Sequence, residues 1–215
     1  FHVAVASFAP AYAQEDPAAG ASPQDAMKAY LELSKPGPEH KKLSMMVGNW
    51  TVAATMHMAP GAPPMTSEAT SSVRPLMGGR YFRETYNGEM MGVKFSGIGV
   101  FGYDKGSKKY VSSWIDSMST GLMNSEGTAD TSGDVITYFG EYFDPMRQQV
   151  VKTKYVLKVK NRKSHTAAMY EVAADGSERK TVELVYTRVA KGEGAKKQGA
   201  KKQGAKKQGA KKQGA

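Results

Sequence analysis

From residue 49 onward, closely spaced turn residues divide the chain into ten short segments that favour β-strand. Gly78-Gly79, Asn87-Gly88 and Asp144-Pro145 are examples of the turn signals that separate runs of alternating apolar and polar residues. The expected strands are residues 49–58, 65–73, 80–86, 94–104, 109–116, 122–128, 135–143, 149–159, 165–172 and 181–189. No segment with a helical period intervenes, so each connection is expected to join antiparallel neighbours.

Ten antiparallel strands must close into a barrel or split into a sandwich, because a long open sheet leaves two unpaired edges. Glycine favours closure here. Gly97, Gly99 and Gly102 in one segment, with Gly127 and Gly140 in neighbouring ones, permit the sharp coiling of barrel corners. We therefore predict an all-β fold, a closed antiparallel up-and-down barrel of about ten strands with short N-terminal helices.

Helix signals occur only before residue 48. Ser22 is a capping residue, Pro23 suits the first helical position, and Asp25 supplies the acid of a capping box. This helix is expected to end at the Lys35-Pro36-Gly37-Pro38 segment, and a second short helix over 39–46 is expected to end before Gly48.

The first thirteen residues are apolar and rich in small side chains, and they end in Ala11-Tyr12-Ala13. This pattern is typical of the late part of a secretory signal peptide with its cleavage site, although a frayed apolar N-terminus would look similar. We expect cleavage near Ala13 and a periplasmic or secreted protein. The predicted organisation is a signal peptide remnant (1–13), a linker and helix (14–38), a barrel domain (39–189) and a tail (190–215).

The basic charge of the chain is concentrated in its tail. The formal net charge is +10, and residues 190–215 hold nine lysines and one glutamate in repeats of Gly-Ala-Lys-Lys-Gln. The tail has no apolar side chain larger than alanine, so we expect it to be disordered and solvated. A functional hypothesis for the tail is a nonspecific electrostatic contact with a polyanion such as nucleic acid or anionic lipid. The rest of the chain is nearly neutral, so its pI of about 9.6 does not indicate a folded nucleic-acid-binding domain.

Composition excludes several classes of chemistry. The chain has no cysteine, which rules out disulfides, thiolate nucleophiles and cysteine-ligated zinc. No apolar run approaches the ~18 residues that a transmembrane helix needs.

Gly48-Asn49-Trp50 follows an expected short helix and begins the first expected strand. In this it resembles the Gly-x-Trp signature of the calycins, the lipocalin and fatty-acid-binding-protein barrels. In those barrels a basic residue of the last strand packs over the tryptophan, and Arg188 stands in the corresponding place. The resemblance thus implies a structural barrel base made of Gly48, Trp50 and Arg188.

A closer resemblance, over roughly residues 45–188, is to the bacterial domain of unknown function 1579. It rests on the strings MHMAPGAPPMT (56–66), RPLMGGRY (74–81), GEMMG (88–92), WIDSMSTG (114–121) and GEYFDPM (140–146). The resemblance implies a secreted or periplasmic calycin-like protein. It brings no catalytic residues with it.

Catalytic and metal motifs are weak. No Gly-x-Ser-x-Gly is present, and the Gly-x-Gly-x-x-Gly at 97–102 lies inside a strand, without the helix that phosphate binding needs. Met56, His57 and Met58 could suggest a soft copper site, but successive strand side chains point to opposite faces. Haem ligation by His57 or His165 is a further alternative. We predict no metal and no cofactor.

The candidate ligand-binding residues share strand faces that mix aromatic and polar side chains, as ligand-binding cavities do. Period alone does not decide which faces point inward. The candidates are Arg80, Phe82, Glu84, Tyr86, Trp114, Asp116, Met118, Glu126, Met169 and Glu171.

The function that these patterns favour is non-catalytic binding of a small, partly apolar molecule in the barrel. One alternative is an enzyme that uses a cavity carboxylate, Asp116, Glu126 or Glu171, as acid or base. Another is an envelope interaction protein with a solid barrel and a polyanion-binding tail.

Deletion of residues 190–215 should leave the melting temperature of the barrel unchanged, because that segment has nothing apolar to bury. The same deletion should sharply weaken retention on heparin, and retention of the full chain should fall steeply with salt. A truncated protein that still binds heparin at about 0.15 M salt, where the Debye length is about 8 Å, would relocate that contact to the barrel.

Overall fold

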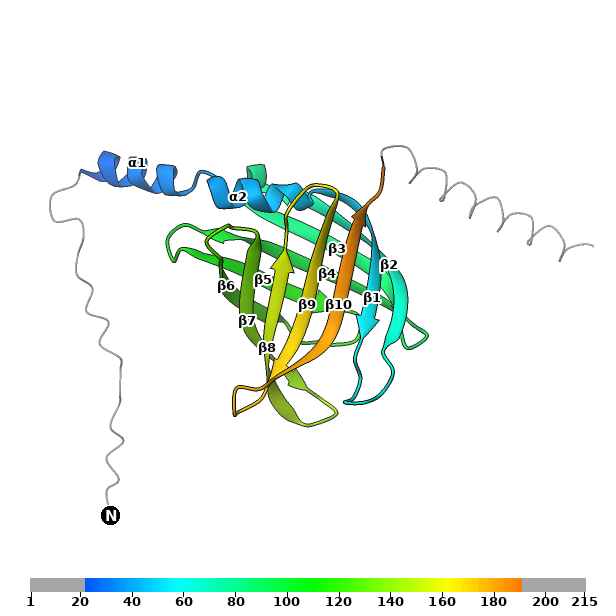
Figure 1. Cartoon of the computed structure of the whole chain (residues 1–215). Helices are drawn as coiled ribbons and strands as arrows, with labels where there is room; N and C mark the ends of the chain where they lie inside the picture. The colour runs from blue at the N-terminus through cyan, green and yellow to red at the C-terminus, as the bar shows by residue number, and fades with distance from the viewer. Residues whose placement is uncertain (1–21, 191–215) are drawn as a thin grey trace, which may run out of the picture. The chain divides into compact units, whose positions relative to one another are not determined.

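The structure, a computed structural model that describes residues 22–190, contains a closed barrel of ten antiparallel strands (Figure 1). Consecutive strands pair along the chain, and β1 pairs with β10 to complete the ring. The strands are β1 (Gly48–Met56), β2 (Met65–Leu76), β3 (Tyr81–Met90), β4 (Val93–Asp104), β5 (Lys109–Asp116), β6 (Met123–Ala129), β7 (Val135–Asp144), β8 (Gln149–Lys158), β9 (Ser164–Val172) and β10 (Glu178–Arg188). The predicted all-β barrel is confirmed.

Two helices and a short 3₁₀ turn precede the barrel. In α1 (Pro23–Leu33) the Ser22 hydroxyl accepts a hydrogen bond from the Asp25 N–H, so the expected cap is formed. Next come α2 (Pro38–Leu43) and the 3₁₀ turn η1 (Ser44–Met46). The predicted signal peptide remnant lies outside the described residues, as does nearly all of the tail.

Two expectations need correction. A 3₁₀ turn, η2 (Met77–Gly79), lies between β2 and β3, where no helix was expected, because Gly78 at φ 69° tightens the connection. Strand β10 begins at Glu178 rather than at Thr181. Its pairing with β9 continues past an irregularity between Lys180 and Val182, and alternation in the sequence cannot show such a bulge.

The β1–β10 seam is held by Trp50 and Arg188, whose Cα atoms are register partners. The Trp50 ring is buried, and the Arg188 guanidinium carbon lies 4.1 Å from its centroid. The guanidinium also donates hydrogen bonds to the carbonyls of Met45 and Val47, each 2.7 Å long, and to the carbonyl of Arg162. The expected contact is therefore present, and it ties the last strand to the segment before the first.

Helix α2 and η1 cover one end of the barrel, here called the α2 end (Figure 1). Leu43 and Met46 are buried in the barrel core, and the Trp50 indole donates a hydrogen bond to the Met46 carbonyl. His40 is buried and meets the Tyr103 ring edge-on at 6.1 Å. This end is consequently closed.

Packing inside the barrel changes along its axis. Towards the α2 end, most inward side chains are buried: Trp50, Val52, Val73, Phe82, Tyr110, Ile136, Tyr138, Leu157, Ala167 and Tyr186. Towards the other end, here called the open end, many inward side chains are only half-buried: Glu84, Phe95, Ser112, Trp114, Ser125, Tyr155, Met169 and Leu184. These inward side chains keep part of their accessible surface, so the interior is less tightly packed towards the open end than towards the α2 end. We call the interior of this half the lumen.

Loops at the two ends differ in charge. At the α2 end, loops 105–108, 130–134 and 159–163 carry most of the charged loop residues. At the open end, loops 57–64, 91–92 and 117–122 contain no Asp, Glu, Lys or Arg. Large apolar side chains are exposed there instead: Met58, Met91, Met118, Leu122 and Met146. We call these exposed apolar side chains the apolar rim. The other two loops of the open end, 145–148 and 173–177, contain Arg147 and Asp175.

Replacement of Arg188 by alanine should lower the melting temperature by several degrees. It removes a cation–π contact of about 0.5–2 kcal/mol, together with hydrogen bonds that bridge three backbone segments. Differential scanning calorimetry checks this expectation. Arg162→Ala is the matched control, because its exposed side chain can be removed while the carbonyl that accepts from Arg188 remains. Equal melting temperatures for the two variants would contradict the role assigned to Arg188.

Candidate functional site

Five side chains from four strands form the inner boundary of the lumen, where the packed half of the barrel ends. This lumen floor consists of Ser71 on β2, Glu84 and Tyr86 on β3, Tyr155 on β8 and Tyr186 on β10. The Ser71 hydroxyl donates to Glu84 Oε1 at 2.6 Å. The Tyr186 side chain hydrogen-bonds both Glu84 and Tyr155, so residues of β2 and β10 meet at the Glu84 carboxyl group and Tyr155 on β8 is joined to it through Tyr186.

Burial controls the electrostatics of the lumen floor. Desolvation raises the pKa of Glu84, and the hydrogen bonds from Ser71 and Tyr186 offset only part of that effect. Burial and the nearby Glu84 likewise raise the pKa of Tyr155 and of Tyr186, so both phenols stay protonated and can donate. No ion pair to Glu84 is formed within residues 22–190. The carboxyl group is thus enclosed and has neutral partners.

Tyr86 of the lumen floor and two further tyrosines present hydroxyl groups to the interior. Tyr86, Tyr110 and Tyr138 are 8%, 4% and 2% exposed. Within the described residues, none of their hydroxyls makes a hydrogen bond. None of the three oxygen atoms is completely buried either, so each keeps some accessible surface. Burial raises the pKa of Tyr110 to about 12, so its hydroxyl is a donor at neutral pH. These oxygens are open to hydrogen-bonding partners that the chain itself does not supply.

Trp114 lies flat along the wall of the lumen because its neighbours on β4 are glycines. A Cβ added at Gly97 would lie 2.1 Å from Trp114 Cζ2, and one at Gly99 would lie 3.2 Å from Cε3. The ring stacks with Phe95 at 6.5 Å and meets Tyr86 edge-on at 6.4 Å. Its indole N–H donates to Asp116 Oδ2 at 2.9 Å. The sequence predicted these glycines as barrel corners, and the structure shows that they also make room for an indole.

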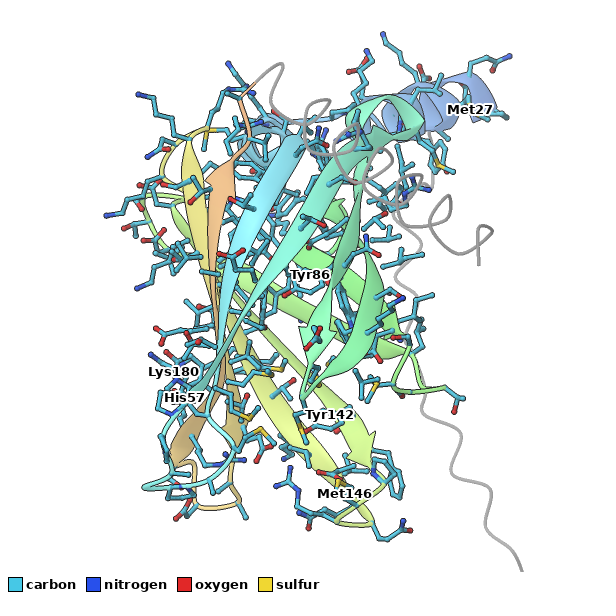
Figure 2. The ribbon with its side chains drawn as sticks, turned by 90° about the vertical axis from the view of Figure 1, so that its right-hand side faces the viewer. Met27, His57, Tyr86, Tyr142, Met146 and Lys180 are labelled. Atoms are coloured by element: carbon cyan, nitrogen blue, oxygen red, sulfur yellow. The ribbon has the colours of Figure 1, made fainter. Side chains whose placement is uncertain are left out.

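The mouth of the lumen carries an ion-pair network from the β7–β8 turn. Arg147 donates to Asp144 at 2.6 Å and to both oxygens of Glu171, at 2.7 and 3.0 Å. Arg179 on β10 also donates to Glu171, at 2.7 Å. These two guanidinium groups hold the pKa of Glu171 below its usual range. Figure 2 shows Tyr142 and Met146 towards this end of the barrel and Tyr86 midway along it.

A groove of about 620 Å³ crosses the wall next to the mouth. It lies where β6 and β7 separate, since their pairing ends at Ser125 and Gly140 although β7 continues to Asp144. Its lining combines outer-face side chains with Gly140 and Thr153 of the inner face: Leu122, Asn124, Phe139, Gly140, Glu141, Lys152, Thr153 and Val172. The groove is therefore a lateral approach to the open-end half of the barrel.

Most of the candidate residues from the sequence lie on inner faces. These are Phe82, which is in the packed half, and Glu84, Tyr86, Trp114, Asp116, Met169 and Glu171. Whether they bind a ligand remains a prediction.

Three candidates are not in the lumen. Arg80 lies after η2 and donates to the Met77 carbonyl at the α2 end. Met118 is 53% exposed in an open-end loop. Glu126 is on the outer face of β6, where it pairs with Lys109, because Gly127 and Ser125 take the inner face. Because these inward residues of β6 are small and not strongly apolar, hydrophobic alternation did not indicate which face of the strand points inward.

Sequence reasoning missed Ser71, Tyr155, Tyr186 and Arg147. A search of each strand for aromatic residues at the alternate positions that point inward would have found Tyr155 and Tyr186. Ser71 and Arg147 carry no such signal, because their roles depend on partners from other strands.

The two histidines considered as metal or haem ligands have other neighbours in the structure. His165 stacks on Tyr186 at 4.1 Å and meets Trp50 at 4.4 Å in the packed half, where burial lowers its pKa to about 4. His57 lies in an open-end loop, 3.7 Å from Glu183 (Figure 2). Among residues 22–190 no three His, Cys, Asp or Glu side chains are placed to hold a metal ion together. A helix long and apolar enough to cross a membrane is also not found in that range.

Replacement of Glu84 by glutamine should stabilise the barrel at neutral pH but not at acidic pH. Glutamine keeps the hydrogen bonds of the protonated carboxyl, whereas the raised pKa means that wild type loses stability as pH rises from about 4.5, the ordinary glutamate value. The melting-temperature difference between variant and wild type should be near zero at about pH 4 and positive at about pH 7.5. His165 is present in both proteins, so its contribution cancels.

Glu126→Gln is the control for this comparison. It removes the same charge from an exposed ion pair and should lower stability only slightly, if at all. A variant at Glu84 that is no more stable than wild type at neutral pH would contradict a strained, buried carboxyl.

Two solved structures align with most of this chain at low sequence identity. The crystal structure of Rv2717c from M. tuberculosis aligns with a TM-score of 0.52 and 14% identity, covering 73% of this chain and 100% of that one. The S-type phycobiliprotein lyase CPES from Guillardia theta aligns with a TM-score of 0.46 and 12% identity, covering 72% and 99%. Comparison with curated proteins finds no match.

A family model described as "Protein of unknown function (DUF1579)" matches residues 35–188, which includes α2, η1 and all ten strands. The match covers well over half of the sequence. The chain therefore belongs to the DUF1579 family and has a lipocalin-like barrel.

Proposed function

We propose that this protein binds a small, partly apolar molecule in the lumen, against the lumen floor. The observation that carries the proposal is Glu84, a carboxyl group enclosed by the barrel, bonded to neutral partners and still accessible from inside. Natural cores rarely contain such a group, because an enclosed carboxyl without a cation is costly to bury. A binding site needs a few polar groups to orient its ligand, and this role would account for the enclosed carboxyl group of Glu84.

The walls above the lumen floor suit an apolar ligand body. Phe95, Trp114, Met169 and Leu184 are inward and half-buried, so they offer apolar surface to whatever enters. The unbonded hydroxyls of Tyr86 and Tyr138 add donors for a polar group. Small-molecule binding sites are usually lined by apolar side chains and contain a small number of polar groups that orient the ligand.

Two routes lead to the lumen, the mouth inside the apolar rim and the groove between β6 and β7. Both lie at the end away from α2. The packed half behind the lumen floor leaves no route from the α2 end, so a ligand enters and leaves through the open end.

Acid–base catalysis is a second candidate function, and the raised pKa of Glu84 favours it. The other carboxylates considered for that role fit less well. Glu171 is held ionised by two guanidinium groups, and Glu126 faces solvent. His165, the nearest candidate proton carrier, is sealed behind Tyr186. Binding is therefore the function that the lumen supports best.

The proposal is tested with N-phenyl-1-naphthylamine, a neutral fluorophore whose emission rises in apolar surroundings. Wild-type protein should enhance its emission saturably. Ser112→Trp fills the lumen from β5 and should weaken binding by at least about tenfold, a loss of about 1.4 kcal/mol. Ser113→Trp is the matched control, because Ser113 is on the outer face beside Asn124.

Equal binding by the two variants would place the fluorophore on the surface and contradict the proposal. Native mass spectrometry of protein purified from its own host, which looks for a retained small molecule, identifies the natural ligand.

A further inference from the structure

The charges that face the lumen are unbalanced. Glu84, Asp116, Asp144 and Glu171 lie on inner faces, and within residues 22–190 the guanidinium groups that meet them are Arg147 and Arg179. Both arginines are engaged at the mouth by Glu171, and Arg147 also by Asp144. Glu84 and Asp116 consequently face the lumen without a cation from the described part of the chain.

The Trp114 ring lies between the Asp116 carboxylate and the base of the Glu84 side chain. Asp116 accepts the indole N–H at 2.9 Å and the Met118 N–H, also at 2.9 Å. Glu84 is the Cα partner of Gly99, and Gly99 is the Cα partner of Trp114. The six-membered edge of the ring lies over Gly97 and Gly99, and a Cβ at Gly99 would be 3.8 Å from Glu84 Cβ. An aromatic face thus extends between two acids.

Aromatic side chains and an unbonded phenol complete the surroundings. Phe95 stacks with Trp114, and Tyr86 meets both rings edge-on. The Tyr86 hydroxyl, on a side chain that is 92% removed from solvent, has no hydrogen-bond partner within the described residues. Aromatic faces attract cations through their quadrupoles, and a carboxylate attracts them through its charge. Both features favour the same kind of ligand.

We propose that the lumen selects a cationic amphiphile, a protonated amine attached to an apolar body, whose ammonium group lies between Glu84 and the Trp114 ring. This inference rests on the proposed function and specifies its ligand class. The ammonium donates hydrogen bonds to the carboxylate of Glu84 and contacts the aromatic face, while the apolar body packs along Met169 and Leu184. A charge-assisted pair enclosed in the barrel stabilises both partners.

The same arrangement rejects anionic amphiphiles such as fatty acids. A ligand carboxylate on the lumen floor would meet Glu84, and the described part of the chain places no unpaired guanidinium or ammonium group there to neutralise either charge. Two carboxylates in one enclosed site cannot both ionise without a large cost.

Isothermal titration calorimetry at about pH 7.5 with octylamine, 1-octanol and octanoate tests this inference, since the three probes share a chain and differ in head-group charge. Octylamine should bind at least about tenfold more tightly than 1-octanol, the lower limit for a hydrogen bond to a charged group. Octanoate should bind more weakly than the alcohol. Glu84→Gln should reduce the preference for the amine to about threefold or less and leave 1-octanol binding unchanged.

Two further variants locate the effect. Asp116→Asn should reduce the amine preference in the same direction as Glu84→Gln. Glu126→Gln removes one negative charge from the outer face and should leave the preference intact, which separates a lumen site from attraction by net charge.

The outcomes distinguish this inference from the proposed function. If 1-octanol binds but octylamine binds no more tightly, or if the amine preference survives in both the Glu84 and Asp116 variants, the ligand class is wrong while lumen binding stands. If neither these three probes nor N-phenyl-1-naphthylamine bind, both proposals are overturned.

Discussion

The stacking of Arg188 on Trp50 is the interaction on which the rest of the barrel depends. A sheet of ten strands is useful as a container only if its first and last strands meet, and these two residues are partners across that seam. Because the same guanidinium also binds the carbonyls of Met45 and Val47, closing the ring also fixes the segment that leads from α2. One side chain therefore couples the closure of the wall to the covering of one end.

The division of the barrel into two halves follows from that arrangement. Apolar side chains from α2, η1 and the neighbouring strand ends fill the α2 end, and His165 is stacked into it with its pKa lowered. The open-end half receives no such filling, so its inward side chains keep accessible surface. Closure of the barrel and the proposed binding are thus assigned to different halves of the barrel, the first to Trp50 and Arg188 and the second to Glu84 and Trp114.

The fold could be predicted from the sequence because its signals are local. Turn residues divided the strands with errors of a few residues, and the glycine-rich segment 97–102 indicated coiling. The candidate site was harder to predict from the sequence. It depends on which face of each strand points inward and on hydrogen bonds between residues of different strands. Glu126 was a candidate because its strand face could line a cavity, and the period could not decide which face points inward; Ser125 and Gly127 take the inner face. The bonds from Ser71 and Tyr186 to Glu84 join distant strands, and no spacing along the chain encodes them.

The indole of Trp114 keeps its place because Gly97 and Gly99 have no side chains. A single methyl group at residue 97 would lie 2.1 Å from the ring, so even alanine there would push the indole off the wall and into the space beside it. The width of the barrel interior at this level therefore depends on the lack of side chains at Gly97 and Gly99 on the neighbouring strand. A larger residue at this one backbone position would be enough to narrow the interior of the barrel. Under the proposed function, it would change the size of molecule that the lumen admits without touching that molecule.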